Sequence, residues 1–252
     1  MRLAGAFLRA ANALVSFVVA LCLCTAGLYS VYALWDNSRV YSAAEDVRAD
    51  MMKLKPTVIE AGGASFEELL TVNPDVCAWV TIDNTNIDYP VLQGATNLTY
   101  INTDVYGNFA MAGSIFLDSR SDRGFGDTYS LLYGHHMANG NMFGDLDKFE
   151  EETFFRKNKT GNLILPDRTY DLEIYACMLV TASEDAIFDP QQYQDDINSL
   201  LDFVEQNALY YDADTVAELR QTDGSSQILA LSTCSRQDSD SRILVIARKT
   251  GL

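Results

Sequence analysis

The sequence predicts a mainly β domain, closed or nearly closed, that follows a single membrane-spanning helix and a helical segment. Three observations predict this class. An uncharged apolar segment lies near the N-terminus, a region of helical periodicity follows it, and from residue 73 onward the pattern changes to short β-branched and aromatic runs. Gly, Asn, Asp and Pro separate these runs, which is typical of a closed β structure.

The apolar segment covers residues 10–35, and its 26 residues carry no charge. About 20 apolar residues span a bilayer as a helix, so the segment is long enough even when tilted. Arg2 and Arg9 precede it, and three aromatic residues lie toward its far end, where amphipathic rings favour the membrane interface. The positive-inside rule then predicts a single-pass protein of the cell membrane, with a cytoplasmic N-terminus and residues 36–252 outside.

Two other interpretations of this segment fit less well. A cleaved signal peptide has an apolar stretch of roughly 7–15 residues and an A-x-A-like site, whereas this segment is longer and Val31-Tyr32-Ala33 is a poor site. A lipoprotein needs a small residue before its acceptor cysteine, but leucine precedes both Cys22 and Cys24. The sequence favours an uncleaved anchor over residues 1–35.

The remaining chain divides into a helical segment, 36–72, and a β domain, 73–252. In the first, apolar residues recur at steps of three and four, and Pro56 interrupts the pattern. In the second, eight strands are expected around 77–82, 87–93, 114–118, 128–135, 161–165, 169–182, 226–234 and 242–249. One helix interrupts them: Asp189 is placed to cap it, and Pro190 suits its first turn.

Composition excludes several classes of function. The net charge of −17 argues against a nucleic-acid partner, because binding phosphates requires clustered Lys and Arg. Five Cys in 252 residues do not make a disulfide scaffold, and two His leave little room for a multi-His metal site. We expect neither a metal nor a cofactor.

Cys234 and Arg242 are the first candidates for chemistry. Cys234 ends an apolar run that begins at Gln227, a polar stretch follows, and Arg242 begins the next apolar run. If the two runs pair as a hairpin, the thiol and the guanidinium flank its loop and can face one site. The alternative is a core cysteine beside a solvent-facing arginine.

The other candidates are the two histidines, His135 and His136, which are adjacent and end the run Tyr129–Leu132. Neighbouring strand residues face opposite sides, so one of the two at most faces a given pocket. Imidazole serves as acid and base near neutral pH; the alternative is two structural histidines. Cys77 and Cys177 lie within apolar runs and are expected in the core, although a disulfide between them stays open.

Together these motifs resemble the active-site signature of sortases, the membrane-anchored cysteine transpeptidases of Gram-positive bacteria. The resemblance is closest to class B and covers residues 66–252. It is carried by Leu231-Ser232-Thr233-Cys234, by Arg242 eight residues later, and by Tyr133-Gly134-His135 upstream. Further matching segments are Asn73-Pro74-Asp75, Trp79-Val80, Asn86-Ile87-Asp88-Tyr89-Pro90-Val91, Ala112-Gly113-Ser114-Ile115-Phe116-Leu117-Asp118 and Met142-Phe143-Gly144-Asp145-Leu146.

The resemblance implies an eight-stranded sortase-type barrel with N-terminal helices and a helix in the insertion at about 186–222. It implies Cys234 as the nucleophile, His135 as the acid/base and Arg242 as the stabiliser of the oxyanion and substrate. The implied reaction cleaves a Thr-containing sorting signal near the C-terminus of a surface protein. The acyl group then passes through a Cys234 thioester to an amine of peptidoglycan or its lipid-linked precursor.

Two rival functions remain at this stage. A tethered cysteine protease would use water in place of the amine, and the sequence does not decide between these acceptors. A wall-facing binding module would use the same fold without catalysis, but the Cys, His and Arg that catalysis needs are all present.

Overall fold

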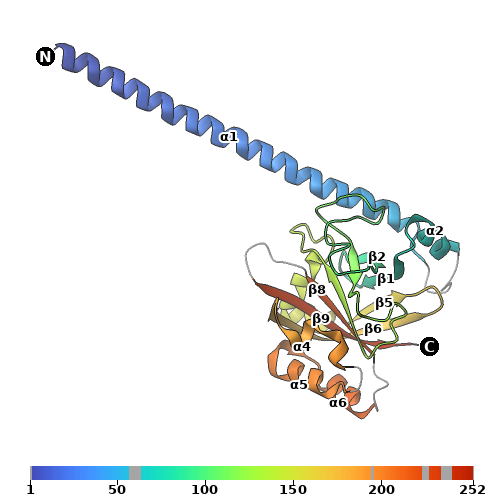
Figure 1. Ribbon diagram of the computed structural model, residues 1–252. Helices are drawn as coiled ribbons and strands as arrows, with labels where there is room; N and C mark the ends of the chain where they lie inside the picture. The colour runs from blue at the N-terminus through green and yellow to red at the C-terminus, as the bar shows by residue number, and fades with distance from the viewer. Residues whose placement is uncertain (1, 57–63, 194–195, 223–226, 234–239, 252) are drawn as a thin grey trace. The chain divides into compact units, whose positions relative to one another are not determined.

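The computed structural model describes residues 2–56, 64–193, 196–222, 227–233 and 240–251. The chain forms two compact units, residues 1–43 and 44–252. Helix α1 (Arg2–Met52) runs through the first unit without a break (Figure 1). Among the described residues it is the one helix long and apolar enough to cross a membrane, judged by length and composition.

Two hydroxyl side chains of the apolar segment bond to the backbone of α1 itself. Thr25 Oγ1 donates to the carbonyl of Leu21 at 3.0 Å, and Ser30 Oγ donates to that of Ala26 at 2.9 Å. Such bonds to the preceding turn satisfy a hydroxyl where water is absent. These two hydroxyl groups are therefore compatible with a bilayer.

The second unit is built on one sheet that closes on itself. Its strand order is β5-β1-β2-β3-β4-β8-β9-β6, and a pairing between β5 and β6 completes an eight-stranded barrel, with β7 added beside β6. The strands are β1 (Val76–Ile82), β2 (Asp88–Leu92), β3 (Ile115–Leu117), β4 (Tyr129–Gly134), β5 (Thr160–Ile164), β6 (Thr169–Thr181), β7 (Ala208–Tyr211), β8 (Gln227–Thr233) and β9 (Ser241–Thr250). The eight expected strands and the closed fold are confirmed.

Several shorter helices surround the barrel, more than the single helix expected among the strands. They are α2 (Ala64–Val72), the 3-10 helix η1 (Gly144–Glu150), α3 (Glu152–Lys157), α4 (Asp185–Phe188), the 3-10 helix η2 (Pro190–Tyr193), α5 (Asn198–Asn207) and α6 (Ala213–Gln221). The single helix expected after Asp189 is divided in two: the 3-10 helix η2 begins at Pro190, and α5 begins only at Asn198. Asp189 forms an ion pair with Arg120, whereas Asp196 accepts a hydrogen bond from the backbone N–H of Asn198, where α5 begins.

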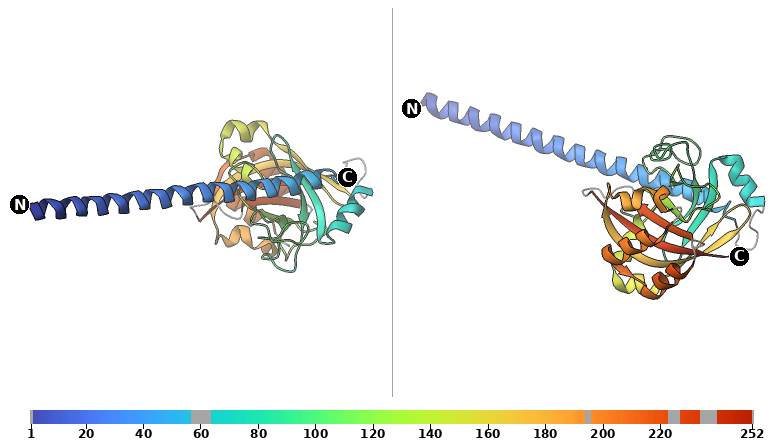
Figure 2. Two further views of the ribbon diagram at one scale, coloured as in Figure 1. Left: turned by 90° about the horizontal axis from the view of Figure 1, so that it is seen from above. Right: turned by 60° about the horizontal axis from the view of Figure 1, so that its bottom comes forward.

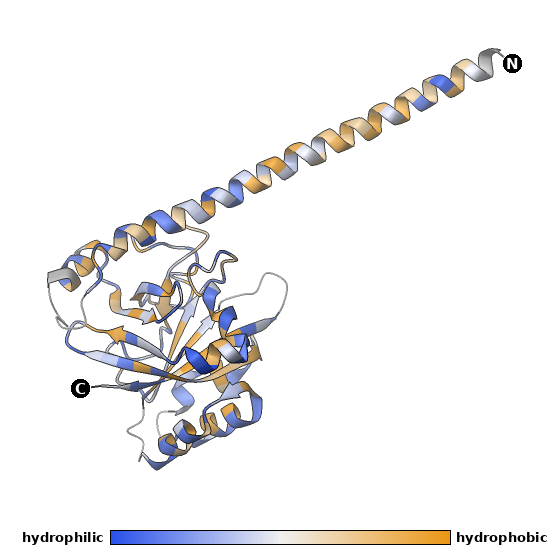
Figure 3. Ribbon diagram, turned by 180° about the vertical axis from the view of Figure 1, so that it is seen from behind, coloured by the Kyte–Doolittle hydropathy of each residue, from blue (hydrophilic) through white to orange (hydrophobic). Residues whose placement is uncertain are grey.

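The insertion helices pack on one side of the barrel. Figure 1 shows α4, α5 and α6 together on one side of the barrel, and the right-hand view of Figure 2 shows these orange helices next to the red strands at the C-terminal end of the chain. Leu200, Leu201 and Val204 of α5 are fully buried, together with apolar residues of β4, β6, β8 and β9. Figure 3 shows the same distribution, with apolar residues concentrated in the strands and on the inner faces of these helices. This burial supports one wall of the barrel next to the ends of β4 and β8.

Lys249 is a buried cation in β9 and provides a test of the fold. Its ammonium donates to the carbonyl of Phe125 at 2.7 Å, and burial lowers its pKa to about 7.

Between about pH 7 and 10 the unfolded chain binds a proton that the folded chain has lost, so the free energy of unfolding rises with pH by up to about 1.4 kcal/mol per pH unit. We expect Lys249→Met to flatten this rise in urea titrations of residues 36–252 at pH 7.5 and 9.5. If the free energy of unfolding rises equally with pH in the wild-type protein and in Lys249→Met, the rise does not come from Lys249.

Candidate active site

The ends of three strands meet at one edge of the barrel. In the parallel pair β4–β8, Tyr133 lies opposite Ser232, and Gly134 lies opposite Thr233. In the antiparallel pair β8–β9, Ser232 lies opposite Leu244, and the backbone N–H of Ile243 donates to Thr233 Oγ1 at 3.3 Å. The end of β4, the end of β8 and the start of β9 are therefore side by side.

His135 directly follows β4 at this edge. Its Nε2 lies 2.6 Å from the carbonyl oxygen of Ile101, and its own carbonyl accepts a hydrogen bond from the backbone N–H of Phe143 at 3.0 Å. A carbonyl only accepts, so Nε2 carries the proton in this contact and Nδ1 is left as the basic nitrogen. The preceding Gly134 is required by space, since a Cβ there would lie 2.4 Å from Ile115 Cδ1.

His136 has a different partner. Its Nε2 lies 2.7 Å from Asp147 Oδ2 in η1, and its backbone forms a bridge with Met142. The two imidazoles thus bond to different parts of the chain, as the alternation of neighbouring residues predicts. The contact of His135 is with Ile101, which lines the pocket described next, whereas that of His136 is with the η1 segment.

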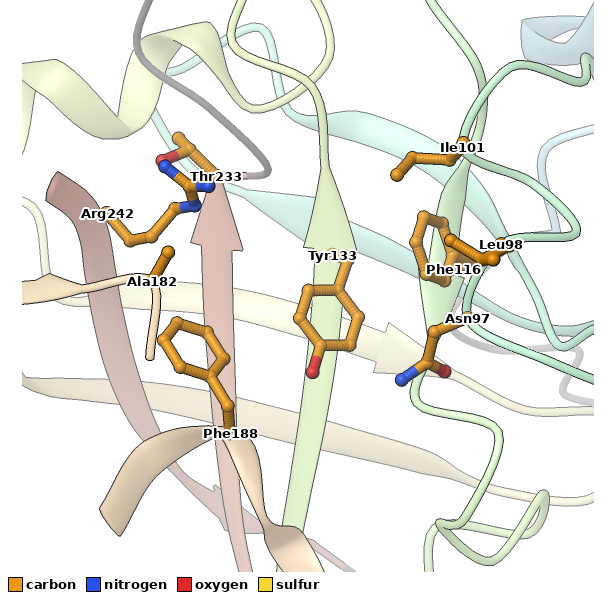
Figure 4. Close-up of a pocket in the computed structure, with 9 residues that line it drawn as sticks. All are labelled: Asn97, Leu98, Ile101, Phe116, Tyr133, Ala182, Phe188, Thr233 and Arg242. Carbon is orange, nitrogen blue, oxygen red and sulfur yellow. The ribbon is translucent and has the colours of Figure 1, made fainter. Parts of the chain in front are cut away.

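A pocket of about 260 Å³ opens beside this edge (Figure 4). It is lined by Asn97, Leu98, Ile101, Phe116, Tyr133, Ala182, Phe188, Thr233 and Arg242. Figure 4 shows Arg242 and Thr233 on one side of Tyr133, and Phe116, Leu98 and Asn97 on the other. The pocket therefore combines a mainly apolar surface with a guanidinium at one end, which is typical of a site that binds a small group in a fixed orientation.

The loop between β2 and β3, which supplies one side of the pocket, is tied to the start of β1. Asn73 Nδ2 donates to the carbonyl of Val105 at 2.8 Å, and the hydroxyl of Tyr100 donates to Asp75 Oδ2 at 2.7 Å. Both Asn73 and Asp75 belong to the Asn-Pro-Asp motif of the sequence. That motif therefore has a structural role here: it anchors the segment that carries Leu98 and Ile101.

Of the three predicted site residues, the structure describes two and brings them to one edge. His135 contacts the pocket residue Ile101, and Arg242 lines the pocket itself. Cys234 lies outside the described residues. In the sequence it directly follows Thr233, which is a pocket residue.

The described residues that line the pocket include neither the other two arginines that follow Cys234 nor the other two cysteines of the β domain. Arg248 forms ion pairs with Glu173 and Glu218, while Arg236 is not among the described residues. Cys77 and Cys177 are free, so they form no disulfide, and burial raises the pKa of each thiol to about 12. Since the thiolate is the nucleophilic form, neither suits nucleophilic catalysis at neutral pH.

Sequence reasoning did not identify most of the residues that line the pocket. Asn97 and Ala182 come from loops and Phe188 ends the short helix α4, and only the folded chain brings the three together. Tyr133 and Phe116 belong to motifs that resemble the family, but the sequence assigned neither residue a role in the site. Leu98 is 74% exposed although it is apolar, but this exposure is a property of the folded chain and gives no signal in the sequence.

Comparisons with known proteins identify the family and the fold. The family model of the sortase domain matches residues 80–250. Sortase B of Listeria monocytogenes serovar 1/2a is 31% identical over 206 residues, 81% of each chain, and sortase B of Staphylococcus aureus is 29% identical over 185 residues, 73% of each.

Solved structures are similar as well. Sortase B of B. anthracis, solved in complex with AAEK1, superposes with a TM-score of 0.70 at 26% identity, over 85% of this chain and 99% of that one. A Streptococcus pyogenes class B sortase involved in pilus biogenesis gives 0.66 at 37% identity, over 75% of this chain and 99% of that one.

Proposed function

The chain belongs to the sortase family as a class B-like cysteine transpeptidase of the cell wall. On that basis we propose that it cleaves a Thr-containing sorting signal near the C-terminus of a surface protein. It then joins the new acyl end to an amine of peptidoglycan or its lipid-linked precursor. One observation carries the proposal. The ends of β4, β8 and β9 are adjacent: Arg242 and Thr233 line the pocket, His135 contacts the pocket residue Ile101, and Cys234 follows Thr233 in the sequence.

The proposed reaction has two half-reactions. The Cys234 thiolate attacks the carbonyl carbon of the substrate threonine, and the peptide C–N bond breaks as charged His135 gives its proton to the leaving amine. The acceptor amine then attacks the thioester, and neutral His135 takes its proton while the thiolate leaves. One amide is exchanged for another, so no oxidant or cofactor is consumed.

Arg242 supplies the electrostatic part of this proposal. The oxyanion that forms in each half-reaction needs fixed donors, and a guanidinium is always charged and offers a planar fork. Arg242 reaches the pocket from the start of β9, next to Thr233. Apolar walls reduce solvent screening there, which strengthens the interaction with a developing charge.

We expect Arg242→Lys to lose about 10²–10³ in kcat/KM, the cost of removing one oxyanion donor in other enzymes. Lysine keeps the charge but not the fork that holds a carbonyl and its oxyanion together. Arg248→Ala and Arg236→Ala serve as controls and should lose little, because Arg248 pairs with carboxylates away from the pocket. If Arg242→Lys stays within about threefold of wild type on the same peptide, its assigned role is wrong.

The membrane topology is also part of the proposal. The apolar part of α1 crosses the cell membrane once, the N-terminus is cytoplasmic, and the catalytic domain faces the cell wall. Support comes from Arg2 and Arg9, both of which precede the apolar segment.

The products formed with an added amine test the function. The full chain in detergent is incubated with a library of sorting-signal peptides, with and without an amine acceptor, and the products are identified by mass spectrometry. Both a glycine-peptide amine and a lysine side-chain amine are offered, since one similar structure is of a sortase involved in pilus biogenesis. A peptide–amine conjugate is the expected product. A free acid alone would indicate a protease, and no cleavage of any peptide would indicate a binding module.

A further inference from the structure

A completely buried carboxylate lies behind the pocket. Asp118 directly follows β3, and its side chain has no exposed surface. Its Oδ2 accepts hydrogen bonds from Tyr133 Oη at 3.0 Å, Asn97 Nδ2 at 2.9 Å and Arg120 Nη2 at 2.9 Å. Its Oδ1 accepts from the backbone N–H and the Nε of Arg120, both at 2.9 Å.

These donors connect Asp118 to three separate segments of the pocket wall. Asn97 comes from the β2–β3 loop and Tyr133 from β4, and both line the pocket. The third link runs through Arg120, whose Nη2 also donates to the carbonyl of Phe188 at 2.6 Å. The rings of Tyr133 and Phe188 are stacked with centroids 6.3 Å apart, and those of Tyr133 and Phe116 are 5.3 Å apart.

The polar ends of two lining residues are occupied by these bonds. The Tyr133 hydroxyl donates to Asp118, and the Asn97 amide both donates to Asp118 and accepts from the backbone N–H of Ser119 at 2.7 Å. Burial alone would raise the pKa of Asp118, but the hydrogen bonds from Arg120 and Asn97 outweigh it and hold the pKa below its usual value. The carboxylate therefore stays ionised at neutral pH and keeps its full strength as an acceptor.

We propose that Asp118 is a positioning residue that sets the shape of the peptide-binding pocket by holding Asn97, Tyr133 and the Phe188 segment in place before the sorting signal binds. The inference rests on the proposed function, because it takes the pocket to be the peptide site. Side chains that are already ordered lose little conformational entropy when a ligand binds, so the network contributes to affinity without touching the substrate. Loss of Asp118 should raise KM and leave the chemical step nearly unchanged.

Asp118→Asn tests this in the full chain in detergent, with the peptide that the wild-type protein cleaves fastest. Asparagine has nearly the shape of aspartate, but it has no charge, and its NH₂ group cannot accept the hydrogen bonds that one carboxylate oxygen accepts. We expect kcat/KM to fall by roughly 10- to 100-fold, the range that corresponds to a hydrogen bond to a charged group, mainly through KM. The rate at which iodoacetamide alkylates Cys234 should not change, because the proposal gives Asp118 no part in the reactivity of the thiol.

Asp88→Asn is the matched control. Asp88 also accepts hydrogen bonds from three side chains, Trp79 at 2.6 Å, Thr81 at 3.0 Å and Lys55 at 2.7 Å, but none of the four lines the pocket. Its KM should match that of wild type. Tyr133→Phe removes a single donor from the network and is the second variant if Asp118→Asn does not fold. It should raise KM by about threefold or more.

The possible outcomes separate the two proposals. A wild-type KM in folded Asp118→Asn, or in Tyr133→Phe where that variant replaces it, overturns the positioning role and leaves the transpeptidase intact. Equal loss of peptide turnover and of Cys234 alkylation in Asp118→Asn also overturns it, since that is general damage to the site. Absence of peptide cleavage by the wild-type chain overturns the proposed function and this inference with it.

Discussion

Cys234→Ala should abolish both cleavage and transfer while leaving the fold unchanged. The bond that forms in the first half-reaction is to the sulfur, and an alanine methyl group cannot make it. The other cysteines cannot substitute. Cys77 and Cys177 are buried with pKa values raised to about 12, and Cys22 and Cys24 lie in the apolar segment.

The measurement is the rate of peptide cleavage by the purified variant, followed by mass spectrometry. Cys77→Ala is the matched control, because it removes a thiol from the barrel core and should keep its activity per folded molecule. Circular dichroism establishes that both variants are folded. Cleavage by Cys234→Ala at more than a few per cent of the wild-type rate would exclude Cys234 as the nucleophile.

His135→Ala should lose about 10²–10⁴ in kcat/KM, the usual contribution of a positioned acid or base. His136→Ala should keep substantial activity. The reason is the difference in partners: His135 bonds to Ile101 in the pocket wall, whereas His136 bonds to Asp147 in η1. In the proposed reaction only His135 exchanges protons with the leaving and incoming amines.

The adjacent histidine is therefore a control of matched chemistry. Both variants are compared on one peptide, with their folded fractions measured by circular dichroism. Equal losses in the two folded variants would mean that the choice of His135 over His136 is unsupported. A larger loss in His136→Ala would reverse the assignment.

The strands of the barrel were predictable because local pattern and tertiary structure agree. β-branched and aromatic runs bounded by turn residues predicted all eight strands of the closed sheet. The short strand β7 was missed because its four residues follow α5 directly, with no turn residue between them. The insertion helix was expected to run on from Asp189, but the chain forms the short helix η2 at Pro190 and begins α5 only at Asn198. The ion pair of Asp189 with distant Arg120 is a contact that local sequence cannot reveal.

The placement of the candidate residues was predictable, but the walls of the pocket were not. His135 and Arg242 lie at strand ends, as their positions after and before apolar runs predicted, and their catalytic roles stay predictions. The pocket depends on loops whose positions are set by distant bonds, such as that of Tyr100 to Asp75. Asp118 could not be assigned a role from the sequence either, since its donors come from 21 residues before it and from up to 15 residues after it.

The central claim is that the acyl group passes through a thioester on Cys234, and mass spectrometry of the quenched enzyme tests it most directly. Wild-type protein is mixed with its best peptide in the absence of an amine acceptor, quenched in acid and digested. We predict that the digest peptide containing Cys234 gains the mass of the acyl fragment. When an amine is added, this mass should disappear from the Cys234 peptide, and the acyl fragment should be found joined to the amine. Cleavage that continues after Cys234 has been alkylated, or an acyl group found on a different residue, would contradict it.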